Sequence, residues 1–457
     1  MLKKFNIIPI IFIIFFHISN NKIINEKNKE PKLIFVYEHM RHGARGPPFD
    51  SNSNFTDEYG TKWFGDGDLT NIGKRMHYIL GIRNRKKYSS LININKFNPK
   101  EILIKSTNSN RTIQSVLSQL YGIYLPGIGE KLNNNKEIEF AYPPNKKYLS
   151  DDVIKEVNEL GNFSLINGIE IFPIHPFENG KLFLNEISEC PNMKKIKEDL
   201  IKKSNITLIY DKINKEFGNE LKTYFNYSDT KFIYDFNKII SITDNFICNY
   251  VHNKNLDDFL NKTKINKEKF YNISIELHTA FLYQNQCDLE ICTMTASPLM
   301  EDLLIYISNR IKYQNEDNYK YPKFVIHSGH DTTLSPIEYF MFGVFGTKYK
   351  YIDFASNVLF EVYKSENYSS GYFVKYIIDD EEMLNIDFEE FKNKVNKAIW
   401  SKEKIRNFCG ISNSKFSTLS IIIIIILSIF SLIMIGINIF LCYKLNKKKE
   451  ILFEPLN

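Results

Sequence analysis

One histidine lies between two arginines in the segment Arg41-His42-Gly43-Ala44-Arg45. Arginine guanidinium groups bind anions through paired hydrogen bonds, and an imidazole can act as a nucleophile toward a bound anion. These residue types at this spacing therefore predict an anion site that contains its own nucleophile. Such a loop could bind the anion by itself, but cleaving a bond in it needs an acid from elsewhere in the chain.

Two further segments carry groups that would complete such a site, namely Arg111 and the pair His330-Asp331. With the first segment they supply three arginines, two histidines and one aspartate. This set suits phosphoryl transfer to a histidine. The arginines neutralise the phosphate oxygens, a neutral imidazole attacks phosphorus, and an acid protonates the departing alkoxide.

Each of the three segments follows a short apolar run, at residues 33–37, 102–106 and 323–326. Runs of this length and composition are typical of buried strands. Ligands of open α/β sheets bind beyond the carboxyl ends of parallel strands, so the three loops meet if these strands are neighbours. Residues 357–363 and 372–376 predict a terminal pair of strands.

Helices are predicted between these strands. Thr70 is expected to cap a helix that runs to Tyr88, and a second helix is expected to begin after Arg111. The face of the first helix that is expected to be buried consists of Ile72, Met76, Ile79 and Leu80. Residues from about 126 to 300 have helical patterns with a lower apolar content, which predicts an α-rich insertion that covers the sheet.

The two ends of the chain predict targeting and membrane segments. Residues 1–20 combine two lysines with a short apolar run, which is typical of a secretory signal peptide; an uncleaved anchor is the less favoured alternative. Residues 419–442 are apolar over a length that spans a membrane, and the tail at 443–457 is rich in lysine. The chain is thus expected to be a single-pass type I membrane protein, with its ectodomain in a lysosomal or endosomal lumen or outside the cell.

The composition supports a globular ectodomain and no nucleic-acid partner. The net charge of +6 is spread along a chain in which Asn, Lys and Ile are abundant, so its basic stretches do not predict binding to nucleic acid. Eight Asn-x-Ser/Thr sequons predict a glycoprotein. An odd number of lumenal cysteines allows at most two disulfides and leaves one thiol over. These cysteines are Cys190, Cys248, Cys287, Cys292 and Cys409.

The residues of the predicted site resemble the motifs of the histidine acid phosphatases. Arg41-His42-Gly43-Ala44-Arg45-Gly46-Pro47 matches the Arg-His-Gly-x-Arg-x-Pro motif of that family, and His330-Asp331 within residues 328–333 resembles its second motif. Residues 106–112 resemble the segment that supplies the third active-site arginine, and residues 69–81 the first helix. The similarity covers residues 32 to 409, and the order of signal peptide, ectodomain, span and tail is similar to the membrane-anchored lysosomal branch. A lone Arg-His-Gly triplet is a weak signal, but matching groups at three strand ends are specific.

This resemblance implies an acid phosphatase that acts on small-molecule phosphate monoesters. His42 would be the nucleophile that forms a phosphohistidine, and Asp331 would protonate the leaving group. The groups that would bind the phosphoryl group are Arg41, Arg45, Arg111 and His330. No cofactor and no metal are implied, because the arginines already supply positive charge. A phytase-like inositol-phosphate phosphatase and a catalytically silent binding ectodomain are the alternatives, and whether the chain forms a homodimer is left open.

The resemblance also implies the fold, which is α/β with a phosphoglycerate-mutase-like central mixed sheet flanked by helices and an α-rich inserted cap domain. One C-terminal transmembrane helix follows. The phosphatase domain would cover residues 31–409, with the core at about 31–125 and 301–409 and the insertion at about 126–300. Cys190 and Cys409 resemble a disulfide pair of the family. Asn357 stands where a partner of Cys248 is expected, which leaves Cys248, Cys287 and Cys292 to share one bridge.

The remaining histidines and one glycine are expected to be structural. His39 and His327 are expected to be core residues. Four further histidines lack metal-ligand spacing and are expected at ordinary surface or helix positions: His77, His175, His252 and His278. Gly43 is expected to leave space for the backbone beside the phosphate.

Overall fold

The computed structural model describes residues 30–48, 57, 59–63, 65, 67–177, 190–203, 206–226, 236–285, 288–316, 320–411 and 418–452. The signal peptide predicted at residues 1–20 lies outside these ranges. The chain divides into two units, Met1–Ser401 and Lys402–Asn457.

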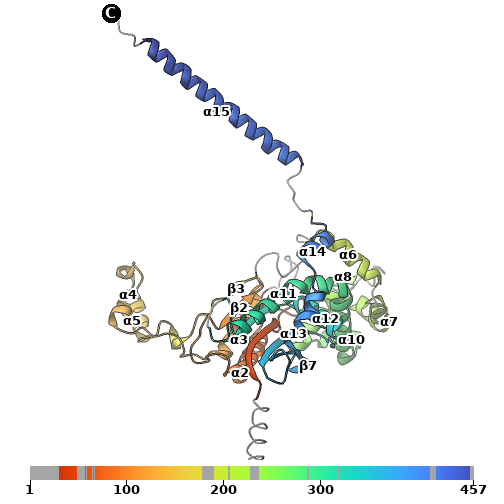
Figure 1. Cartoon of the computed structure of the whole chain (residues 1–457). Coiled ribbons are helices and arrows are strands. Elements are labelled where there is room, and N and C mark those ends of the chain that lie inside the picture. Colours follow the sequence, from red (N-terminus) through yellow and green to blue (C-terminus); the bar gives the residue numbers. More distant parts are fainter. Residues whose placement is uncertain are drawn as a thin grey trace, which may run out of the picture. The chain divides into compact units, whose positions relative to one another are not determined.

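A mixed sheet forms the centre of the first unit (Figure 1). It has seven strands in the order β3-β2-β4-β1-β5-β6-β7. The strands β3, β2, β4 and β1 are parallel neighbours, and the remaining pairs are antiparallel. The strands are β1 (Lys32–Arg41), β2 (Ile102–Ser106), β3 (His175–Pro176), β4 (Phe324–Gly329), β5 (Asn357–Lys364), β6 (Tyr372–Ile378) and β7 (Glu381–Asp387). The predicted α/β class with a mixed sheet is therefore confirmed. β3 and β7 were not predicted, because neither has an apolar run of its own.

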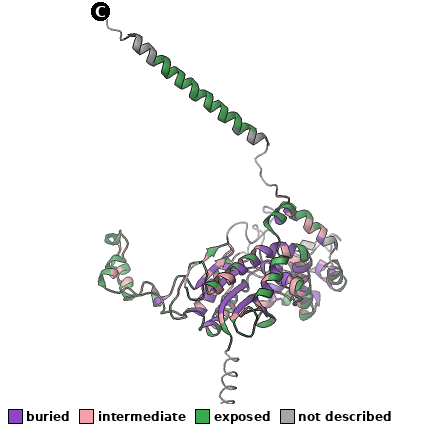
Figure 2. Cartoon of the chain, in the orientation of Figure 1, coloured by how far each residue is buried: buried purple, intermediate pink, exposed green. Residues whose placement is uncertain are grey.

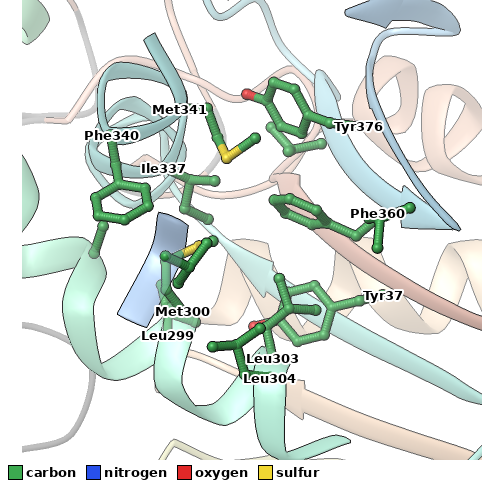
Figure 3. Close-up of a cluster of buried hydrophobic side chains, with 14 of the residues drawn as sticks. Tyr37, Leu299, Met300, Leu303, Leu304, Ile337, Phe340, Met341, Phe360 and Tyr376 are labelled. Carbon is green, nitrogen blue, oxygen red and sulfur yellow. The ribbon is translucent and has the colours of Figure 1, made fainter. Parts of the chain in front are cut away.

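Helices cover both faces of the sheet. On one face, α11 (Leu289–Lys312), α12 (Asp331–Phe345) and α13 (Phe388–Ala398) contribute to a cluster with Tyr37 of β1 and Phe360 of β5, which Figure 3 shows. On the other face, α2 (Asn71–Tyr88) and α3 (Asn110–Ile123) contribute to a second cluster with Phe324 of β4. Burying each large apolar side chain stabilises the fold by about 1.5–3 kcal/mol.

The predicted start of α2 is confirmed, but its predicted buried face is wrong. The Thr70 hydroxyl accepts a hydrogen bond from Gly73 N at 3.3 Å, as expected of an N-cap. Ile72 and Ile79 are 39% and 56% exposed, however. The buried residues are Gly73, His77, Gly81, Asn84 and Tyr88. Glycines mark this face because α2 approaches α3 closely there: a Cβ atom on Gly81 would lie 2.7 Å from the Cα atom of Gly122. An apolar stripe cannot indicate a contact made by glycines and polar groups.

The part of the chain between β2 and β4 is rich in helices, as predicted. A group of these helices has its own core, which includes Phe246, Phe259 and Phe270. The helices of this part are α3, α4 (Asn135–Phe140), α5 (Asp151–Glu159), α6 (Met193–Lys203), α7 (Ile206–Tyr224), α8 (Phe236–Val251), α9 (Asp257–Thr263), α10 (Lys267–Ala280) and α11, with short helical turns at Lys146–Tyr148, Ile166–Gly168 and Phe281–Asn285.

The second unit contains α14 (Lys402–Cys409) and α15 (Thr418–Leu452). Residues Ile425–Leu445 of α15 are long and apolar enough to cross a membrane, by length and composition. The described side chains of this segment are exposed (Figure 2). This helix covers the predicted span at residues 419–442.

Candidate active site

The three parallel strands β2, β4 and β1 end at the same level of the sheet. Arg41 pairs in register with Gly329, and Ser106 pairs with Ser328. Beyond these pairs, the amide of His42 donates to the carbonyl of Gly329 at 2.9 Å, and the amide of Thr107 donates to the carbonyl of Ser328 at 3.1 Å. The predicted meeting of the three loops at one sheet edge is thus observed.

The strand that carries the nucleophile candidate is longer than predicted. β1 continues past Tyr37 to Arg41, so Arg41 lies in the strand and His42 directly after it. The additional residues Glu38, His39 and Arg41 are polar and almost fully buried. Buried polar groups need hydrogen-bond partners, and the surrounding elements supply most of them, although His39 Nδ1 and Arg41 Nε have none among the described residues.

The structure brings the predicted site residues together. Arg41 Nη2 lies 2.7 Å from Asp331 Oδ2, and Arg111 Nη2 lies 3.4 Å from His330 Nδ1. The ring centroids of His42 and His330 are 5.4 Å apart. Arg45 belongs to the same group, since its positive charge lowers the pKa of both His42 and Asp331.

The surroundings of His42 determine which ring nitrogen carries the proton. Burial and the charges of Arg41 and Arg45 lower the pKa of His42 well below its usual value, so the ring is neutral at physiological pH. Its Nδ1 lies 2.9 Å from the carbonyl oxygen of Gly43, which can only accept a hydrogen bond. Nδ1 therefore holds the proton, and Nε2 keeps a free lone pair.

Two of the arginines have unused hydrogen-bonding capacity. Within the described residues, the buried Nε–H groups of Arg41 and Arg111 make no hydrogen bond. Leaving a buried donor unpaired costs about 1–3 kcal/mol, and the large majority of such groups have a partner. Both arginines are therefore suited to bind an anion.

Asp331 begins α12 and is ionised while it is paired with Arg41. Burial raises the pKa of Asp331, but Arg41 and Arg45 outweigh burial, and the pKa lies below its usual range. Its position in the first turn of a helix also favours the charged carboxylate. Asp331 can therefore donate a proton only after its ion pair with Arg41 has been weakened.

His330 uses both ring nitrogens to hold neighbouring side chains. Its Nδ1 accepts from Arg111, so its Nε2 carries the proton and donates to the hydroxyl of Thr107 at 3.1 Å. Burial and the charge of Arg111 lower the pKa of His330 to about 4, which makes the ring neutral above that pH. In this arrangement His330 orients Arg111, and its predicted direct contact with a phosphoryl group stays a prediction.

Two site residues come from α8 and were not predicted. The carboxylate of Asp244 forms a paired ion bond with Arg45, with both N–O distances at 3.1 Å. One helical turn later, the buried free thiol of Cys248 lies 3.5 Å from Arg45 Nη1. The spacing of four residues, which places both groups on one face of a helix, was the only signal in the sequence. It is too common to identify a site.

A buried carboxylate behind the site was also missed. Glu38 is fully buried in β1 and accepts hydrogen bonds from the side-chain amides of Asn84, Gln119 and Asn357 at 2.8, 2.7 and 2.6 Å. These amides come from α2, α3 and β5. Glu38 therefore ties three elements to the strand that carries Arg41. Asn357, which stands in place of an expected cysteine, is part of this network.

The prediction that Gly43 leaves space for neighbouring backbone agrees with the structure. A Cβ atom at this position would lie 2.7 Å from the Cα atom of Gly73 in α2. Gly43 thus allows the loop to pack against the backbone of α2.

Four other histidines lie in the core or in helices. His39 and His327 are buried core residues, bonded to Thr333 and Tyr37. His77 and His278 lie in the helices α2 and α10, as the prediction of surface or helix positions allows. His77 is wholly buried against α3, and His278 lines a cavity with Arg41 and Asp331, which was not predicted.

Among the described cysteines that were predicted to be lumenal, one thiol is left over. Cys190, Cys292 and Cys409 are each disulfide-bonded, and Cys248 is free. Cys287 lies outside the described residues. Pairing of Cys190 with Cys409 stays a prediction.

Comparisons with known proteins agree with this geometry. The chain is 24% identical to mouse (Mus musculus) prostatic acid phosphatase over 308 residues, which is 67% of this chain and 69% of the relative. It is 24% identical to the lysosomal acid phosphatase of Xenopus laevis over 345 residues, which is 74% of this chain and 67% of the relative.

Solved structures share the fold at lower identity. The multiple inositol polyphosphate phosphatase of Bifidobacterium longum in complex with inositol hexasulfate matches with a TM-score of 0.52 at 13% identity, over 82% of this chain and 95% of that one. The phytase of Klebsiella sp. ASR1 matches with a TM-score of 0.51 at 14% identity, over 77% and 83%. The model of the histidine phosphatase superfamily (branch 2) matches residues 22–379. The chain therefore belongs to branch 2 of the histidine phosphatase superfamily and is an enzyme of the acid phosphatase type.

Proposed function

We propose that this enzyme hydrolyses phosphate monoesters through a covalent phosphohistidine on His42. The observation that carries the proposal is the proton position on this ring. Because Nδ1–H donates to the carbonyl of Gly43, the lone pair of Nε2 is free to attack phosphorus. A bond from Nε2 to phosphorus forms while the bond from phosphorus to the ester oxygen breaks.

Arginine side chains bind the phosphate in this proposal. Arg41, Arg45 and Arg111 surround His42, and two of them have buried donors that are unpaired within the described residues. Their charges neutralise the phosphate and the charge that spreads over its oxygens in the transition state. His330 holds Arg111 in place.

Asp331 is the proposed proton donor to the leaving oxygen. A bound phosphate competes with Asp331 for Arg41 and adds negative charge nearby, and both effects raise the pKa of the carboxyl group. The protonated acid then gives its proton to the ester oxygen as the alcohol departs. In the second step, the resulting carboxylate can take a proton from the water that attacks the phosphohistidine.

The proposed enzyme is anchored in a membrane with its active site on the lumenal or extracellular side. The observed apolar helix supports one span, and the similarity to a lysosomal enzyme supports an acidic compartment. The signal peptide at residues 1–20, the phosphatase domain at 31–409 with its insertion at 126–300, and the cytosolic tail at 443–457 are parts of this proposal. So are the glycans and the disulfide between Cys190 and Cys409.

The test compares wild type with His42→Ala as full-length proteins in detergent, on an aryl phosphate between pH 4 and 8. Wild type should release the phenol fastest in acid, and the variant should be inactive. Rapid quenching with a ³²P-labelled ester should trap label on wild type in an acid-labile, alkali-stable bond. His175→Ala, a change at an exposed histidine, is the matched control and should retain activity. Equal activity in wild type and His42→Ala, or none in wild type, would contradict the proposal.

A further inference from the structure

A small cavity of about 290 Å³ lies beside the proposed proton donor. Its polar lining includes Arg41, Arg45, Asp331, Asp244 and His278, and its apolar lining includes aromatic rings. Pockets for small-molecule ligands usually measure about 300–1,000 Å³, so this cavity suits a compact group. We refer to it as the leaving-group chamber.

The position of Asp331 gives the chamber its role, which rests on the function proposed above. An acid must lie within hydrogen-bond distance of the oxygen that it protonates. Because Asp331 lines the chamber and donates to the ester oxygen, the alcohol part of the substrate occupies the chamber during the reaction. Whatever charges line the chamber therefore act on the alcohol part.

The charge of the phosphate site and the chamber taken together is already balanced when a simple phosphate ester is bound. The charges of Arg41, Arg45 and Arg111, of which the first two line the chamber, equal the two charges of a phosphate dianion plus the one charge of Asp244, provided that Asp331 is protonated. Asp244 is suited to remain ionised, because Arg45 holds both of its oxygens at 3.1 Å. A second phosphate in the alcohol part would add negative charge without a partner, in a largely buried place where such charge is costly.

His278 adds an acceptor to the same cavity. The hydroxyl of Thr243 donates to the carbonyl of Ile239 at 2.8 Å, so it accepts from His278 Nε2 at 3.1 Å. The neutral ring then keeps Nδ1 as an acceptor. Among the described residues that line the chamber, the arginines that bind the phosphate are the positively charged ones. Ser241, Asn245 and Tyr351 also line it and are neutral, so the charge of Asp244 is what favours a cation or a neutral group over a second anion.

Basic residues that could bind further phosphates line a different cavity. Lys62, Lys74 and Lys254 line a cavity of about 730 Å³ that shares no described lining residue with the chamber. Asp331 does not line it. When the ester oxygen lies next to Asp331, the alcohol part of the substrate therefore lies in the chamber with Asp244.

We infer that Asp244 is a specificity-determining residue, which restricts the enzyme to monophosphate esters of compact neutral or cationic alcohols and excludes alcohols that carry a second phosphate. Although the fold is shared with phytases, this chamber opposes a polyphosphorylated alcohol.

The test uses esters that differ only at the far end of a two-carbon alcohol. These are 2-aminoethyl phosphate, 2-hydroxyethyl phosphate and ethylene glycol bisphosphate, each assayed with the full-length enzyme for kcat/KM. Wild type should cleave the amine and the hydroxyl ester at least about tenfold faster than the bisphosphate. Asp244→Asn removes the charge and keeps the size, and should reduce this ratio to near one. Its effect on Arg45 is common to all three esters and cancels in the ratio.

Cys248→Ser is the matched control, because Cys248 also contacts Arg45 but carries no charge. It should change kcat/KM for the three esters by one common factor. The order of rates in wild type is a second measurement that needs no variant to fold. If wild type cleaves the bisphosphate as fast as the other esters, or Asp244→Asn keeps the wild-type ratio, the inference is wrong while the proposed function stands. Failure to cleave any ester would overturn both.

Discussion

Arg41 Nη2 lies 2.7 Å from Asp331 Oδ2, so the proposed phosphate-binding group and the proposed proton donor neutralise each other across the site. Arg41 ends β1 opposite Gly329, the last residue of the parallel neighbour β4, and Asp331 follows Gly329 by two residues at the start of α12. In the proposed mechanism, this contact couples substrate binding to acid catalysis. A phosphate that takes Arg41 away from Asp331 also raises the pKa of the acid that must protonate the leaving group.

Replacing Asp331 by Asn should slow the enzyme most on esters with poor leaving groups. An alkoxide cannot leave without a proton, whereas nitrophenolate leaves readily without one. We expect a loss of kcat/KM, which reports the steps up to release of the alcohol, of about 10²–10⁴ on an alkyl phosphate and a much smaller loss on p-nitrophenyl phosphate. Steady-state kinetics of wild type and Asp331→Asn on both esters give the measurement. An equal loss on the two esters would show that Asp331 does not act as the general acid.

Replacing Glu38 by Gln should destabilise the protein, although only one atom changes. Three side-chain amides donate to the carboxylate, and the Gln amide would direct its own donors at them in a fully buried place. We expect a loss of about 3 kcal/mol in the free energy of unfolding, from a buried group left without a partner.

Glu382→Gln is the control for this change. Glu382 pairs with Lys375 near the surface, where an ion pair contributes about 0–1 kcal/mol. Denaturant unfolding of the full-length proteins in detergent would give both values. Similar losses for the two variants would contradict a special role for the Glu38 network.

The sequence predicted the groups that do the chemistry better than the groups that support them. Arg41, Arg111 and Asp331 were found because each follows a short apolar run in the sequence that predicts a strand, and parallel strands end at one edge. Asp244 was not found, because it lies in a helix of the inserted part, where no strand end indicates which residues face the site. The buried face of α2 was predicted wrongly, since contacts made by glycines leave no periodic pattern of large apolar residues in the sequence.

A buried acid that the proposed chemistry does not use should contribute more stability to the fold in acid than at neutral pH. Glu338 in α12 is almost fully buried, and burial raises its pKa from 4.5 to about 7. The Tyr283 hydroxyl donates to the carboxyl group at 2.9 Å, and this bond lowers the pKa by less than burial raises it. The folded state therefore holds a proton that the unfolded chain releases near pH 4.5.

The sign of the effect follows from this raised pKa. The stability that the protonated group contributes is fully present below pH 4.5, and it is lost as the pH rises through about 7. The loss amounts to about 3 kcal/mol. Glu338→Gln is neutral at every pH and can still accept from Tyr283, so it should remove most of this pH dependence. Glu366→Gln, a change at an exposed residue, should leave it in place. Unfolding of the three full-length proteins in detergent at pH 4.5, 6 and 8 gives the comparison. If wild type and Glu338→Gln lose stability in parallel over this range, Glu338 is not the group that titrates.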